Sequence, residues 1–425
     1  MLDYKLTNFS NGLRVITASL KQTKAVTVLF LVGVGSRYEE GRLSGISHFL
    51  EHMFYKGTSR RPTALDISKA LDSVGADYNA FTSEEQTGFY IRCASEHFDL
   101  ALDILYDILY HSKFDQKELE KEKAVIAEEI NMRQDVPQEQ VAERLKQLVY
   151  NEHPLAREIT GQKETIKQFT RDDLLNYKGK YYQPSKIIVA VAGGGEEAEW
   201  LAKIKEKLEG LPKKESPDFE KFRTSQKNPQ ASLHARKTDQ AHLMMAFRTI
   251  PVRDRRWHTW KVMSNLLGES MSSRLFTEIR EKRGLAYYIH TAMGEFSDNG
   301  ISVVAAGVNI SKIEEAIKVI LEEISRLKTK LVGLDELKRT QENLKGRLYL
   351  SLEESFNVAE YLANEELLLG KIDDPDVLIK KYEKVTAQDL QKFANEFFVA
   401  KNLNLAIIGP FKKQEKYQKI LSSFA

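Results

Sequence analysis

The 425-residue sequence is poor in cysteine, in net charge and in long apolar runs. Cys93 is its single cysteine, which excludes a disulfide within the chain and a cysteine-rich zinc ribbon. The net charge of +2, from 63 basic and 61 acidic residues, gives no overall field that would attract nucleic acid. The longest apolar run, about nine residues from Ala25 to Gly33, is far shorter than the ~20 residues of a membrane span. We therefore expect no nucleic-acid partner and no membrane partner.

Glycine and proline are also too few, at 23 and 10 residues, for a collagen-like or low-complexity chain. The 42% of hydrophobic residues is enough for a folded core. Residues 1–5 include an acid and lead into no apolar segment, so we expect no signal peptide. The lone Cys93 lies in an apolar strand-like stretch and is expected to be buried there. It is compatible with a reducing compartment, and a cytoplasmic location is the expectation.

Periodicity indicates both strands and helices. The β-branched stretches 13–18 and 25–32 predict strands. A helix is expected from about Ser44, because residues 46, 49, 50 and 53 are apolar and fall on one helical face. Further strands are expected at 77–83, 87–93 and 241–247, and further helices at 63–75, 97–111, 117–134 and 138–150.

An internal repeat indicates two related halves. Thr170-Arg-Asp-Asp-Leu leads to the apolar stretch 187–193, and Thr386-Ala-Gln-Asp-Leu leads to 403–409, at a constant offset of 216 residues. We therefore predict an α+β fold of two similar domains, each a mainly antiparallel sheet packed with helices. Their expected bounds are 1–212 and 233–425, joined by a charged, breaker-rich linker over 213–232.

A His-x-x-Glu-His motif carries the chemistry. His48 and His52 are four residues apart, so one helical turn presents both imidazoles on the same side, in a geometry that suits one Zn²⁺. Glu51 lies beside that site and can take a proton from an attacking water. The order of residues is that of the inverzincins. The competing interpretation is a histidine pair that flanks a glutamate by chance.

A catalytic zinc site needs a third protein ligand. No cysteine is near and the other histidines are scattered singly, so a carboxylate is expected. Glu122 and Glu129 are two turns apart on one predicted helix and share a face. The residues alone thus predict a site with two histidines and a carboxylate.

The sequence resembles the insulinase/pitrilysin family of zinc metallopeptidases, in the half-length branch of the mitochondrial processing peptidase β subunit and its bacterial relatives. Residues 48–58, HFLEHMFYKGT, are similar to the family wording, and Glu129 lies 77 residues after His52, as in the family. The resemblance implies that zinc is held by His48, His52 and Glu129 and that Glu51 is the base. It assigns Glu122 a supporting role beside the ligands.

Two further stretches match the family. Residues 75–82 resemble its edge strand near the metal, which implies that Asn79, Ala80 and Phe81 bind a peptide as an added strand. From residues alone an ordinary internal strand is the favoured interpretation. Residues 272–287 match the family's Arg/Tyr pair, which implies that Arg280 and Tyr287 stabilise the oxyanion. The second half contains no His-x-x-Glu-His.

The resemblance implies a zinc-dependent endopeptidase that acts on peptides and unstructured polypeptides within a clamshell chamber. Because double-length relatives have four such domains, it also implies a dimer. We expect Arg280 and Tyr287 to complete the partner's site, and the alternative is that they act within their own chain. A homodimer is expected. The alternatives are the catalytic subunit of a heterodimeric processing peptidase and a non-catalytic assembly subunit, against which the intact metal motif argues.

Overall fold

The computed structural model describes residues 2–424, which form two compact units. Unit 1 comprises the chain up to Asn131, Arg157–Glu220 and Tyr349–Asp374. Unit 2 comprises Met132–Ala156, Lys221–Leu348 and the chain from Pro375 onward. Each unit thus takes a segment from the other half of the chain, and the units depart in this way from the expected domains 1–212 and 233–425.

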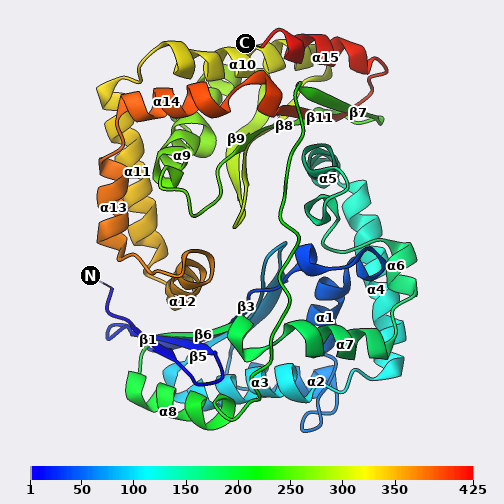
Figure 1. Cartoon of the computed structure of the whole chain (residues 1–425), viewed down its shortest axis with the longest axis vertical. Coiled ribbons are helices and arrows are strands. Elements are labelled where there is room, and N and C mark those ends of the chain that lie inside the picture. Colours follow the sequence, from blue (N-terminus) through cyan, green and yellow to red (C-terminus); the bar gives the residue numbers. More distant parts are fainter. Residues whose placement is uncertain (1, 425) are drawn as a thin grey trace. The chain divides into compact units, whose positions relative to one another are not determined.

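Unit 1 is built on a six-stranded sheet (Figure 1). In sheet order its strands are β1 (Lys5–Asn8), β2 (Arg14–Ser19), β6 (Ile187–Gly193), β3 (Ala25–Val32), β5 (Thr87–Ala94) and β4 (Asp77–Thr82). Its helices are α1 (Ile46–Phe54), α2 (Ala64–Asp72), α3 (Phe98–His111), α4 (Gln116–Asp135, whose last turn belongs to unit 2), α6 (Lys163–Lys167), α7 (Arg171–Tyr181), α8 (Glu197–Leu208) and α12 (Ser355–Asn364). Only the β2–β6 pair is parallel, and β4 forms one edge of the sheet.

The sequence of β3 explains why unit 1 needs a helix from the far end of the chain. Residues 26–32 are all buried, so both faces of this central strand are apolar and both must be covered. One face packs on the main core with α1 and α3, and α12 covers the other. There Val358 and Leu362 of α12 join a buried cluster with Leu29 and Leu31.

Unit 2 is built on a five-stranded sheet. In sheet order its strands are β7 (Gln230–Ala235), β11 (Leu403–Gly409), β8 (Ala241–Thr249), β10 (Gly300–Val308) and β9 (Ala286–Glu295). Its helices are α5 (Pro137–Tyr150), α9 (Trp257–Ser264), α10 (Ile313–Thr329), α11 (Leu334–Ser351, whose last turn belongs to unit 1), α13 (Pro375–Glu383), α14 (Ala387–Phe397) and α15 (Gln414–Ser422). Here α5, from the first half of the chain, covers β8 and β11 through Val141 and Leu145.

The two units retain the internal repeat. Thr170 and Thr386 cap α7 and α14 through reciprocal hydrogen bonds with Asp173 and Asp389, three residues later in each case. The strands that follow, β6 and β11, occupy matching positions beside β3 and β8. The predicted fold class, two similar α+β domains with mainly antiparallel sheets, is confirmed.

Most ends of the predicted helices and strands lie within two residues of the ends in the structure. Cys93 is buried in β5, as expected. One difference is that β7 begins at Gln230, inside the expected linker 213–232. Three π-helical segments, η6 (Asn265–Glu269), η7 (Phe276–Glu281) and η9 (Glu365–Leu369), have no signal in apolar periodicity. Within residues 2–424, no helix is long and apolar enough to cross a membrane.

Candidate metal centre

Helix α1 presents the motif because its two faces differ. Ile46, Leu50 and Met53 are fully buried in the core of unit 1. His48 and His52 lie on another side, with their ring centroids 4.5 Å apart. The apolar face therefore fixes the helix on the sheet and leaves the histidines for another purpose.

A buried carboxylate holds the start of α1. Glu39 accepts hydrogen bonds from the backbone N–H of Gly45 (2.7 Å) and of Ser47 (2.8 Å), which are donors that a helix N-terminus leaves unpaired. Gly45 has φ 95°, and a Cβ there would lie 2.7 Å from the carbonyl oxygen of Thr160, so glycine is required. Burial raises the pKa of Glu39 to about 7, against the lowering effect of these hydrogen bonds.

Helix α4 brings the third donor to the histidines. The Nε2 atom of His48 lies 3.6 Å from Oε1 of Glu129, and Nε2 of His52 lies 3.7 Å from Oε2. One donor atom from each of the three residues lies within 4.8 Å of the others. Glu128, by contrast, is exposed and accepts a hydrogen bond from Asn131. The structure thus places Glu129, rather than Glu128, with the histidines.

The donor set fits zinc. Zn–N and Zn–O bonds of ~2.0–2.1 Å in a tetrahedron separate neighbouring ligand atoms by roughly 3.3 Å, close to the two distances from histidine to glutamate. Two imidazole nitrogens and one carboxylate are also a ligand set of catalytic zinc sites. His48, His52 and Glu129 could therefore hold the ion.

Glu122 orients His52 from behind. Its Oε1 lies 2.7 Å from Nδ1 of His52 and its Oε2 lies 2.6 Å from Nζ of Lys56, while its side chain is 3% exposed. Burial raises the pKa of Glu122, but the bonds to His52 and Lys56 outweigh it and leave the pKa below its usual value. An ionised Glu122 accepts the Nδ1 proton of His52 and leaves Nε2 for a metal.

Glu51 lies next to this donor set. Its Oε2 accepts a hydrogen bond from the hydroxyl of Thr82, at the end of β4. Burial raises the pKa of Glu51, although Thr82 and His52 act in the opposite direction, and the nearby Glu129 adds to the rise. A carboxylate with a raised pKa is a stronger proton acceptor than an ordinary one, which suits a general base.

The expected peptide-binding residues lie on β4, at the edge of the sheet. The backbone oxygen of Asn79 lies 3.4 Å from the hydroxyl of Tyr55, which directs that hydroxyl to the strand. The Ala80 amide donates to the side-chain oxygen of Asn79 (2.9 Å), and Phe81 packs across Gly88 of β5. The edge position agrees with the expectation, and peptide binding stays a prediction.

Arg280 and Tyr287 meet within unit 2. Arg280 lies on the π-helix η7 and Tyr287 lies on β9, at the edge of the second sheet. The guanidinium carbon is 5.8 Å from the Tyr287 ring centre, and this tyrosine is 73% exposed. The sequence spacing therefore brings the two side chains together on an accessible surface.

Three residues of the centre were not assigned from the sequence. Lys56 follows His52 by one helical turn, which was a usable signal. Thr82 and Glu39 gave none, because each reaches the motif through the tertiary arrangement of a strand end and a loop.

The geometry is that of a candidate metal centre, with two histidines and a glutamate around a metal position and a further carboxylate beside it. Comparison with protein families agrees: residues 14–163 match the insulinase family (Peptidase family M16), and residues 168–344 match the Peptidase M16 inactive domain. The chain belongs to Peptidase family M16.

Relatives of similar length support this assignment. The chain is 35% identical over 408 residues to the uncharacterized zinc protease YmxG of Bacillus subtilis (strain 168), covering 94% of this chain and 97% of that protein. It is 31% identical to the uncharacterized zinc protease SCO5738 of Streptomyces coelicolor, covering 96% and 90%. A protease from Helicobacter pylori has the same fold, with a TM-score of 0.92 at 24% identity over 96% of this chain and all of that one.

Proposed function

We propose that this protein is a zinc-dependent endopeptidase that hydrolyses peptides and unstructured polypeptide segments. The observation that carries the proposal is the convergence of His48, His52 and Glu129 with a half-buried Glu51 beside them. A non-catalytic family member has no need of this complete set. Membership of Peptidase family M16 supports the same reaction class.

Each group has a role that follows from its position. A bound zinc ion would supply Lewis-acid polarisation of the scissile carbonyl and lower the pKa of water to about 7. Glu51 accepts the proton of the attacking water and returns it to the leaving amine. Thr82 fixes the carboxylate through its hydrogen bond to Oε2. Glu122, held by Lys56, keeps His52 in the tautomer that leaves Nε2 unprotonated.

Substrate binding in this proposal uses main-chain contacts. The edge strand β4 ends at Thr82, whose hydroxyl contacts the base, so a peptide added along Asn79–Phe81 runs toward Glu51. Strand addition depends on few side chains of the substrate, so one site can bind many unstructured sequences. Arg280 and Tyr287 donate to the developing oxyanion. In the proposed homodimer they come from the partner chain, and the two chains enclose one chamber.

Digestion of an unstructured polypeptide, followed by mass spectrometry of the fragments, tests the proposal. We expect internal cleavage that stops with a chelator and returns with added Zn²⁺. A folded protein of similar size should stay intact. Absence of cleavage from a zinc-loaded preparation contradicts the proposal and favours an assembly role. Co-purification with a different, metal-free subunit would instead support the heterodimeric alternative.

A further inference from the structure

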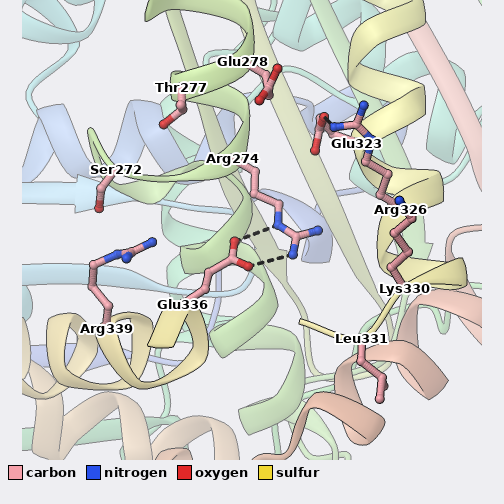
Figure 2. Close-up of a pocket in the computed structure, with 10 residues that line it drawn as sticks. All are labelled: Ser272, Arg274, Thr277, Glu278, Glu323, Arg326, Lys330, Leu331, Glu336 and Arg339. Carbon is pink, nitrogen blue, oxygen red and sulfur yellow. Dashed lines mark hydrogen bonds and ion pairs between the residues drawn. The ribbon is translucent and has the colours of Figure 1, made fainter. Parts of the chain in front are cut away.

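Unit 2 contains an open cavity of about 500 Å³ that has no part in the proposed peptidase chemistry (Figure 2). Its walls come from the stretch 272–278, which includes the start of η7, from the end of α10 and the residues just after it, and from the first turns of α11. The volume lies within the range of small-molecule sites, ~300–1,000 Å³. Charged and polar side chains dominate the lining, so the ligand should be polar as well.

Two of the cavity's carboxylates are neutralised within it. Glu336 accepts two parallel hydrogen bonds from Arg274, at 2.7 and 2.8 Å, which the dashed lines of Figure 2 mark. Glu323 is paired with Arg326 one helical turn away. The Arg274–Glu336 pair connects the stretch 272–278 to α11, and the Glu323–Arg326 pair spans one turn of α10. Each pair thus stabilises the local structure.

The charges that remain are positive. The third carboxylate, Glu278, is held by Lys282 and Arg283, neither of which lines the cavity. Lys330 and Arg339 also face the cavity, and neither side chain has a carboxylate partner among residues 2–424. A concave site with two unneutralised cations concentrates positive potential.

We propose that this cavity binds a small phosphate-bearing anion. Arg339 offers a planar guanidinium that can donate two bonds to one phosphate group, and Lys330 offers a compact charge to a second. In Figure 2, Arg339 and Lys330 lie on opposite sides of the Arg274–Glu336 pair, and both belong to the lining of the one cavity. The hydroxyls of Ser272 and Thr277, also in the lining, supply further donors.

Calorimetric titration of the full-length protein with pyrophosphate tests the proposal. Saturable binding is expected, and Arg339→Gln and Lys330→Gln should each weaken it by about tenfold, the effect of losing one charge-assisted hydrogen bond. Lys338→Gln removes the same charge from an exposed position on α11 outside the lining and should change nothing. All variants keep the same metal ligands, so binding at the metal centre contributes equally to each.

Glu336→Gln separates ligand binding from a structural role of the charges. It removes a negative charge from the cavity and releases the Arg274 guanidinium, so pyrophosphate should bind several-fold more tightly. Melting temperatures of all variants establish that they are folded. The proposal is overturned if pyrophosphate does not bind, if it binds the Arg339 and Lys330 variants as well as the parent, or if succinate binds in its place.

Discussion

The buried carboxylate of Glu122 lies 2.7 Å from Nδ1 of His52 and, through its second oxygen, 2.6 Å from Nζ of Lys56. This chain of contacts connects the end of α1 to α4. It directs Nε2 of His52 toward the carboxylate of Glu129. A lysine outside the His-x-x-Glu-His motif thus becomes part of the machinery that positions a metal ligand.

Replacing Lys56 tests this connection. Lys56→Met leaves Glu122 buried without its cation, so the carboxylate should protonate more readily and hold His52 less firmly. We expect zinc affinity to fall by about 10–100-fold, the usual effect of losing such support. The pH needed for half-maximal zinc binding should also rise, and Lys56→Arg should restore part of the affinity.

Lys123→Met is the matched control for Lys56. Lys123 lies on α4 and pairs with Glu120 instead of Glu122. Zinc affinity, measured by competition with a chromogenic chelator, should stay unchanged in this variant. Equal losses in the Lys56 and Lys123 variants would show that Lys56 has no specific role.

Glu129 and Glu128 provide a second matched pair, because they are neighbours on one helix and face different directions. Glu129→Gln should reduce bound zinc well below the one ion per chain expected of the parent protein. Glu128→Gln should leave it unchanged, since Glu128 is exposed and contacts Asn131. Metal analysis of both variants shows which glutamate binds the ion. An equal loss of zinc from both variants refutes Glu129 as the ligand.

Lys178 should make stability depend on pH. It lies among the rings of Phe54, Tyr110 and Phe114, and burial lowers its pKa from 10.5 to about 8. Below pH 8 both folded and unfolded chains hold the proton, so the folded state bears the full cost of a buried charge. Between pH 8 and 10.5 the folded state releases the proton first, and that cost disappears.

Lys178→Met should therefore raise the free energy of unfolding at pH 7 by about 2 kcal/mol. The gain should shrink as the pH rises from 8 toward 10.5. Urea unfolding at several pH values measures it. Lys180→Met, at an exposed position of the same helix, should have almost no effect. A gain that does not vary with pH would show that the Lys178 charge is not its source.

Mixed dimers test the proposal that Arg280 and Tyr287 act on the partner's metal centre. Glu51→Gln and Tyr287→Phe each inactivate a homodimer in this proposal. If the pair acts in trans, one centre of the mixed dimer carries both changes and the other carries neither, so mixing restores activity. If mixing restores nothing although heterodimers form, Arg280 and Tyr287 serve their own chain.

The sequence predicted most elements of unit 1 but few of unit 2, and it did not predict how the chain divides between the units. The sequence predicted a helix at the position of α5, but an apolar stripe does not specify which sheet a helix covers, and α12 was not predicted. The continuous apolar run of β3 requires a cover on both faces, and only the folded chain shows that α12 supplies the second one.

The metal ligands were predictable from sequence separations. The spacing of His-x-x-Glu-His specifies His48 and His52, and the 77-residue separation shared with the family specifies Glu129. Glu39 and Thr82 were not, since a buried carboxylate in a loop and a threonine at a strand end have no pattern of their own. Their roles arise when the tertiary fold brings them to α1.

Glu51→Gln gives the most direct test of the central claim, that Glu51 is the base of a zinc peptidase. The substitution preserves the size of the side chain and its contact with Thr82 while removing the carboxylate. Zinc content and peptide hydrolysis are measured on the same preparation. We predict about one zinc per chain, as in the parent protein, and a loss of turnover of ~10²–10⁴-fold. Near-normal turnover with zinc bound would contradict the account.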